Sequence, residues 1–213
     1  MICNMDYFKI YADFLKRFLN VKRPLFAVLD AFNGAGGVVA KEVFVDYPLV
    51  QLTTINDLPD GDFPAHGPNP LLAGAMKELC QKVVRQKADF GIAFDADGDR
   101  ALFVDNLGRP VPTYVIAYLI FQHRRPPFVV DELLFKIFRQ NKLLADNDLF
   151  LTKTEFVLIA LEMRSVRSTT SADNFGNFAF EETYYRESGM FTFIRILNLL
   201  SSSNKTLADF SQN

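Results

Sequence analysis

Apolar residues along the chain follow two spacings, and segments of the two kinds alternate. Helical spacing, with apolar residues three or four apart, predicts helices over residues 7–19, 71–87, 133–143 and 190–200. Three further segments predict helices over 38–44, 111–122 and 156–163. Apolar runs bounded by turn-forming residues predict strands over 25–29, 49–55, 90–94, 101–104, 128–131, 149–152 and 178–181. Strands that alternate with helices indicate an α/β layer structure.

Two polar segments interrupt this pattern. Residues 56–70 hold four prolines and two glycines, which predicts a long surface loop. Residues 165–177 are polar and are also expected to form a loop. A turn near 108–113 separates two units, so we expect one domain over residues 1–110 and a second over 111–213. The alternation is compatible with two related α/β units, although their sequences are only weakly similar.

Composition excludes several classes of partner. Hydrophobic residues make up 49% of the chain and charged residues 23%, and the net charge of −2 gives no reason to expect nucleic acid. No apolar run approaches the ~20 residues that span a bilayer. No export signal precedes the first helix. Cys3 and Cys80 lack metal-ligand spacing and fit a reduced chain. We therefore expect a cytoplasmic protein with no nucleic-acid or membrane partner.

Three aspartates at alternate positions, Asp95, Asp97 and Asp99, follow the apolar run at 90–94. Carboxylates this close repel one another unless a cation lies among them, and hard cations such as Mg²⁺ take oxygen ligands. Gly98 lets the loop bend, and Arg100 adds a forked donor suited to phosphate. The pattern therefore predicts a metal site formed by the three carboxylates.

Two other interpretations of this segment are a solvated acidic turn and an EF-hand. Strand-like flanks argue against the first, because loops at strand ends are where α/β sheets present ligands. An EF-hand needs glycine at its sixth loop position and a carboxylate at its twelfth, where this chain has Arg100 and Asn106.

The glycine-rich turn at 33–37 matches no nucleotide pattern and predicts a tight strand-to-helix connection. His66 and His123 are expected at the surface.

The segment 88–100, ADFGIAFDADGDR, resembles the metal-binding loop of the α-D-phosphohexomutases, the family of phosphomannomutase and phosphoglucomutase. Three upstream segments resemble the same second domain of that family in order and spacing: 28–37 with its NGAGG turn, 59–64 (PDGDFP) and 68–72 (PNPLL). The resemblance implies two consecutive three-layer α/β/α domains of the phosphohexomutase type, the second one shortened.

The resemblance also implies a reaction. The family moves a phosphoryl group between the 1- and 6-positions of a hexose phosphate, such as mannose or glucose phosphate, with Mg²⁺ as cofactor. The residues that it implies are Asp95, Asp97 and Asp99 for the metal, Arg100 for catalysis on the phosphate side, and Lys153, Thr154 and Glu181 for substrate binding.

The second half departs from the family pattern at three positions. Leu133 replaces a basic residue, Phe156 replaces the histidine of a Lys-Thr-Gly-His motif, and Tyr185 replaces another histidine. Leucine and phenylalanine provide no charge or proton, and a tyrosine hydroxyl is a poor general base at neutral pH. Phosphosugar binding is therefore expected to be weakened. Residues 187–190 still resemble the start of the family's last helix in this domain.

No segment of the chain resembles the family's serine loop, which carries the phosphoryl group, or its fourth domain. We therefore expect a truncated mutase that cannot catalyse alone. Two alternatives stay open. The chain is a non-catalytic remnant or interaction protein that keeps the α/β scaffold, or it is one half of a split mutase whose partner chain supplies the missing domains.

Overall fold

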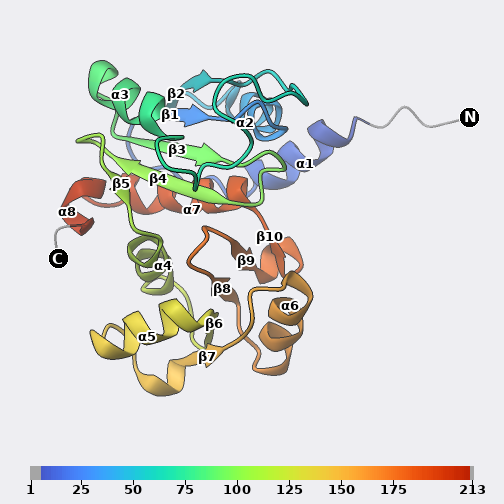
Figure 1. Cartoon of the computed structure of the whole chain (residues 1–213), viewed down its shortest axis with the longest axis vertical. Helices are drawn as coiled ribbons and strands as arrows, with labels where there is room; N and C mark the ends of the chain where they lie inside the picture. Colours follow the sequence, from blue (N-terminus) through green and yellow to red (C-terminus); the bar gives the residue numbers. More distant parts are fainter. Residues whose placement is uncertain (1–5, 212–213) are drawn as a thin grey trace, which may run out of the picture.

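The computed structural model describes residues 6–211, apart from the side chain of Phe156 (Figure 1). The helices are α1 (Tyr7–Lys16), α2 (Gly36–Phe44), α3 (Lys77–Gln86), α4 (Thr113–Phe121), α5 (Glu132–Gln140), α6 (Phe156–Ser165), α7 (Gly189–Ser201) and α8 (Leu207–Ser211), with 3-10 turns η1 (Asp146–Asp148) and η2 (Glu181–Thr183). The strands are β1 (Leu25–Asp30), β2 (Val50–Ile55), β3 (Phe90–Phe94), β4 (Ala101–Asp105), β5 (Pro110–Val111), β6 (Phe128–Val130), β7 (Leu149–Leu151), β8 (Thr170–Ala172), β9 (Phe178–Phe180) and β10 (Arg186–Glu187).

Two five-stranded sheets with one shared topology form the scaffold. The first has the order β2-β1-β3-β4-β5, and the second has the order β7-β6-β8-β9-β10. In each sheet the first strand in the chain pairs in parallel with the second and the third. The fourth and fifth strands then add in antiparallel pairing. The two halves of the chain are therefore structurally related, which their sequences indicate only weakly.

Helices cover both faces of each sheet. On the first sheet, α3 packs over a buried cluster that contains Val28, Leu79 and Val83, while α1, α2 and α7 lie on the other face (Figure 1). The second sheet lies between α6 on one face and the pair α4 and α5 on the other. The predicted α/β class is confirmed, with three layers in each half.

Helix α7 connects the two halves. It belongs to the last part of the chain, yet it packs against β4 and α2 of the first unit and against α4 of the second. Phe193 of this helix is fully buried, and its ring makes edge contacts with Phe44, Phe90 and Phe94. One apolar core therefore runs from the first sheet through α7 into the second half. The domain boundary near residue 110 remains a prediction.

Two predicted elements differ from the structure. The helix expected from residue 71 begins only at Lys77, because turns occupy the residues before it and Gly74 has a φ of +81°. The loop expected over 165–177 contains β8, which lies inside the second sheet between β6 and β9. That prediction was wrong because β8 is polar. Its buried Thr170 is satisfied by hydrogen bonds from Arg124 Nε and Ser168 Oγ, both at 2.8 Å.

In the part of the chain that the structure describes, no helix combines the length and apolar character that crossing a membrane requires.

Candidate metal centre

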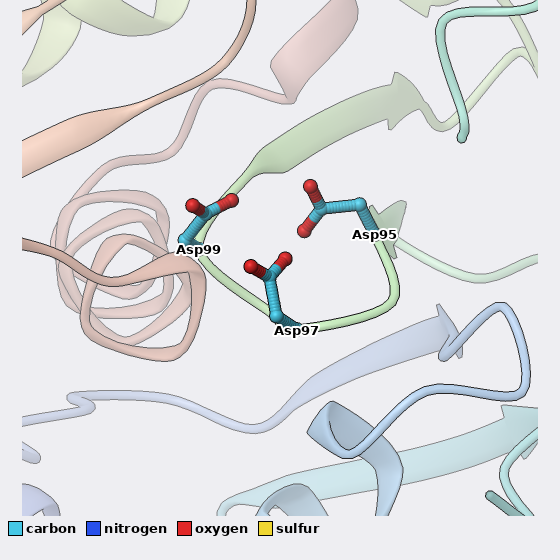
Figure 2. A group of neighbouring side chains, drawn as sticks. All are labelled: Asp95, Asp97 and Asp99. Carbon is cyan, nitrogen blue, oxygen red and sulfur yellow. The ribbon is translucent and has the colours of Figure 1, made fainter. Parts of the chain in front are cut away.

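The three aspartates converge at the end of β3. This strand is fully buried, and Asp95 follows it directly, so the loop begins at the carboxyl edge of the sheet. One carboxylate oxygen from each of Asp95, Asp97 and Asp99 lies within 4.8 Å of the others. Figure 2 shows the three side chains directed toward one another across the bend of the loop. The structure therefore brings together the residues that the sequence proposed as metal ligands.

Close backbone contacts fix the shape of this loop. Gly98 has a φ of +77°, which a side chain would make unfavourable, and its carbonyl accepts a hydrogen bond from Gly189 N at 3.0 Å. On the other side, Ala35 N donates to the Ala96 carbonyl at 3.1 Å. A Cβ on Gly34 would lie 2.3 Å from that carbonyl oxygen. The glycine-rich turn is thus a close-packing element that supports the aspartate loop.

Without a cation, each carboxylate disfavours the ionisation of its neighbours. Burial, followed by the charge of Asp99, raises the pKa of Asp95 from 3.8 to about 7. Burial, followed by the charge of Asp97, also raises the pKa of Asp99. Both effects oppose ionisation, because the loop gathers negative charge where water is partly excluded. A bound cation would reverse both.

The residues present fit a hard divalent cation. All three side chains offer oxygen, the donor that Mg²⁺ and Ca²⁺ prefer. Asp99 Oδ1 is buried and accepts no hydrogen bond from any described residue. A buried acceptor without a partner is costly unless something else satisfies it. Their assignment as metal ligands, and that of Mg²⁺ as the cofactor, remain predictions.

Arg100 lies on the metal loop, close to Asp95. Its backbone N donates to Asp95 Oδ1 at 3.2 Å, and its Nε lies 3.4 Å from Asp95 Oδ2. Nε is nonetheless buried without a hydrogen-bond partner among the described residues. The side chain is about one-third exposed (32%). The guanidinium is therefore an ion-pair partner of Asp95 with donor capacity left over, and its catalytic role stays a prediction.

The residues predicted to bind the sugar do not all line one cavity. Lys153 and Thr154 are exposed and line an open pocket of about 820 Å³, beside Asp131 and Leu133. Glu181 lies outside that lining, with its Oε1 3.8 Å from Arg124 Nη2. The side chain of Phe156, a further predicted departure from the family, is outside the described part of the chain. The substrate-binding roles of Lys153, Thr154 and Glu181 remain predictions.

The sequence interpretation missed two acidic residues near the loop. Asp173 follows β8 as Asp95 follows β3, and the two loops touch through a bridge between Arg100 and Asn177. Glu187 lines a small cavity of about 130 Å³ together with Asp97 and Asp99. Burial, then the charges of Asp99 and Asp173, raise the pKa of Glu187 to about 7. Asp173 could have been found from the strand order that the two sheets share, because it follows β8 as Asp95 follows β3. That shared order becomes visible only in the structure.

His66 is not the surface residue that we expected. Its side chain is 14% exposed, and its Nε2 lies 3.0 Å from the fully buried Asp30 Oδ2. Burial is the largest effect on Asp30 and raises its pKa, while hydrogen bonds oppose that rise. The ring also packs on Phe32. His66 therefore fastens the proline-rich loop to the end of β1. His123 is exposed, as predicted.

Comparison with known proteins gives a family match to the first half of the chain and individual relatives that match most of its length. Residues 9–108 match the family described as phosphoglucomutase/phosphomannomutase, alpha/beta/alpha domain II. The phosphomannomutase of Escherichia coli K12 is 29% identical over 210 residues, which cover 93% of this chain and 46% of that protein. The chain therefore spans about half the length of the curated relatives it matches.

Solved structures share the fold. The phosphoglucomutase/phosphomannomutase family protein of Burkholderia thailandensis has a TM-score of 0.81 at 23% identity, covering 97% of this chain and 46% of that one. The N-acetylphosphoglucosamine mutase of Aspergillus fumigatus, solved with GlcNAc-6P and magnesium, has a TM-score of 0.64 at 14% identity, covering 96% and 52%. The domain match, the relatives and the fold agree with one another. Together they support the α-D-phosphohexomutase family for this chain.

Proposed function

We propose that this chain provides the metal-holding and sugar-facing part of a phosphohexomutase that acts on a hexose phosphate, such as mannose or glucose phosphate. The observation that carries the proposal is the convergence of Asp95, Asp97 and Asp99 within 4.8 Å at a strand end. The structural relative solved with GlcNAc-6P and magnesium supports a phosphosugar and Mg²⁺ as ligands here. On the sequence grounds given above, we place this work in the cytoplasm.

Bound Mg²⁺ would supply positive charge against the negative charge of a phosphoryl group in transfer. Asp95, Asp97 and Asp99 would hold the ion through one oxygen each, leaving positions for water or phosphate oxygen. Arg100 would donate from the partly exposed end of its guanidinium to a phosphate oxygen. Lys153, Thr154 and Glu181 would bind the sugar and its hydroxyl groups from the second unit.

Recognition of the sugar phosphate is expected to be weak in this chain. Leu133 is 46% exposed and lines the same pocket as Lys153, at the position where the family has a basic residue. An apolar group there cannot offset the charge of a phosphate. This observation favours the second candidate, a non-catalytic protein of the same fold, and a single binding measurement separates the two.

We further propose that the polypeptide of residues 1–213 does not turn over its substrate by itself. The family uses a serine loop to carry the phosphoryl group, and these residues contain no match to it. Ser188 lines the same small cavity as Asp97 and Asp99, but its side chain is already engaged. It lies 2.8 Å from the Tyr11 hydroxyl and accepts from Phe191 N, so its oxygen is poorly placed to attack.

The test measures binding and turnover separately on the purified chain. Isothermal titration with mannose 1-phosphate and with glucose 1-phosphate, in Mg²⁺, is expected to give weak but measurable binding. Asp97→Asn removes one carboxylate of the site, and Asp46→Asn is its matched control because Asp46 is exposed beyond the far end of α2. Turnover is assayed with a hexose 1,6-bisphosphate as activator.

The outcomes distinguish the candidates. Binding without turnover supports the proposal, and turnover restored by adding a serine-loop fragment of a relative identifies one half of a split mutase. An absence of phosphosugar binding at millimolar concentration favours the non-catalytic protein. Clear turnover by the chain alone overturns our view of it as a partial active site.

A further inference from the structure

A second cavity lies at the opposite end of α7 from the aspartate loop. It measures about 550 Å³ and is bounded by the last turns of α7, the end of α4, and α8. Figure 1 shows α8 beside the carboxyl end of α7, with α4 below it. Helix α7 has 13 residues, about 20 Å at 1.5 Å per residue, so this cavity is remote from the metal loop.

The charge of this cavity has one sign. Arg195, Lys205 and His123 line it, and none of its thirteen described lining residues is acidic. Two more cations lie at its rim. Lys22 Nζ donates to Asn20 Oδ1, and Arg23 Nη2 donates to the carbonyls of Leu200 and Ser203. The Arg23 contacts also offset the negative end of the α7 dipole, which would otherwise repel an anion.

Arg195 is the largest of the three basic side chains in the lining and has little compensation for its charge. It makes no hydrogen bond or ion pair with any residue in the range 6–211, and its guanidinium only lies near the Phe191 ring. The carboxylate that acts on it, Glu182, accepts hydrogen bonds from Arg124 through both of its oxygens. Burial and then Arg124 lower the pKa of Arg195. A guanidinium that is partly desolvated and unpaired is favourable for an incoming anion.

Most of the remaining lining is apolar. Six of the thirteen residues are large hydrophobic side chains, namely Leu119, Ile120, Ile196, Leu199, Leu200 and Phe210. Small-molecule sites are commonly concave, mostly apolar and of roughly 300–1,000 Å³, with a few polar groups that orient the ligand. A simple inorganic anion would leave most of this surface wet. An organic anion would use both parts of the cavity.

We infer that this cavity binds a phosphorylated organic molecule of about nucleotide size, with its phosphate on Arg195 and Lys205 and its organic part against Leu199 and Phe210. The observation that carries the inference is a lining with three basic side chains and no acidic one, in a largely apolar pocket, and one guanidinium without a hydrogen-bonded or ion-pair partner among the described residues. The site is separate from the proposed phosphosugar site and does not depend on mutase activity.

The experiment uses the full chain with EDTA, so that no divalent ion occupies the aspartate loop. ADP, adenosine and inorganic phosphate are titrated separately by calorimetry. ADP is expected to bind, and each of the two partial probes to bind at least tenfold more weakly. Arg195→Met keeps an apolar stem and should weaken ADP binding about tenfold, since charge-assisted hydrogen bonds to phosphate are lost. Arg85→Met, on the exposed face of α3, is the matched control.

Two further variants keep the test decisive. Lys205 is exposed, so Lys205→Gln should fold normally. It therefore tests the cationic part of the site even if Arg195→Met does not fold. Asp97→Asn alters the metal loop and should leave ADP binding unchanged. The inference is overturned by an absence of ADP binding up to about 5 mM, where even a millimolar site is filled. Unchanged affinity in both cationic variants overturns it too. Phosphate binding as tightly as ADP would refute the organic part.

Discussion

Asp97 is the most exposed of the three clustered aspartates, which makes it the cleanest residue to test. Asp97→Asn removes one charge and keeps the size of the side chain. We expect Mg²⁺ affinity to fall at least tenfold, because a neutral amide oxygen replaces a carboxylate ligand. The metal-free protein should keep its melting temperature or gain slightly, since repulsion with Asp99 is relieved. Calorimetric titration with Mg²⁺ measures this, and equal affinity in the variant would remove Asp97 from the site.

Asp95 gives the metal-free protein a pH dependence of stability. Its pKa is about 7 in the fold against an ordinary 3.8, so the fold favours the protonated form. The stability that follows from this is fully present below pH 3.8 and is lost as the pH rises through about 7. With EDTA present, the melting temperature should therefore be lower at pH 8 than at pH 5, and Mg²⁺ should reverse the fall.

The control for this prediction is Asp95→Asn, which cannot ionise and should flatten that part of the profile. Glu187, whose pKa is also raised to about 7, contributes with the same sign and will remain in the variant. Thermal unfolding at pH 5, 6, 7 and 8, with and without Mg²⁺, measures the difference. If wild type and variant show the same slope in EDTA, Asp95 does not titrate in this range.

At the scale of elements, the aspartate loop is held between the glycine-rich turn and the start of α7. Gly34→Ala would place a Cβ 2.3 Å from the Ala96 carbonyl oxygen, which is rigid backbone. We expect the free energy of unfolding to fall by about 1–3 kcal/mol or more, as overpacking typically costs. Mg²⁺ affinity should fall as well, because the loop must move.

Gly61→Ala is the matched control for this substitution. A Cβ on Gly61 meets nothing within 4 Å, so its effect should stay within about 0.5 kcal/mol. Chemical denaturation of both variants supplies the free energies. An unaltered stability in Gly34→Ala would show that the turn and the loop are not packed as tightly as the structure has them.

At the scale of the whole molecule, we ask whether restoring family residues in the second unit is enough to restore activity. Leu133→Lys, Phe156→His and Tyr185→His together would return family residues to the second unit. We expect phosphosugar affinity to rise, because the substitutions would add cationic or proton-transferring groups to the second unit. Turnover should still be absent, since general acid–base help contributes only about 10²–10⁴-fold and no phosphoryl carrier is added.

The comparison measures binding and mutase activity of the triple variant beside wild type. A variant that interconverts hexose 1- and 6-phosphates alone would show that the carrier lies within residues 1–213. A variant that neither gains affinity nor turns over would mean that the second unit does not face the sugar. The first result would overturn the proposal that residues 1–213 do not turn over substrate by themselves. The second would overturn the assignment of Leu133 to the sugar side.

The sequence by itself determined the features that depend on near neighbours along the chain. Alternating apolar segments are local, so the α/β class and the positions of β1, β3, β4 and α7 could be predicted. The convergence of Asp95, Asp97 and Asp99 also follows locally, because a glycine-containing bend places alternate side chains on one side. In such cases the backbone between the residues is short enough to decide the geometry.

Only the tertiary structure decided what depends on residues far apart. β8 is polar and becomes a central strand because Arg124, far earlier in the chain, satisfies Thr170. His66 becomes largely buried because its Nε2 lies against the Asp30 carboxylate at the end of β1. Arg195 lines a cationic cavity only because α4 and α8 close around α7. Burial and pairing are properties of packing, and the free energy of packing is shared among segments that no local pattern connects.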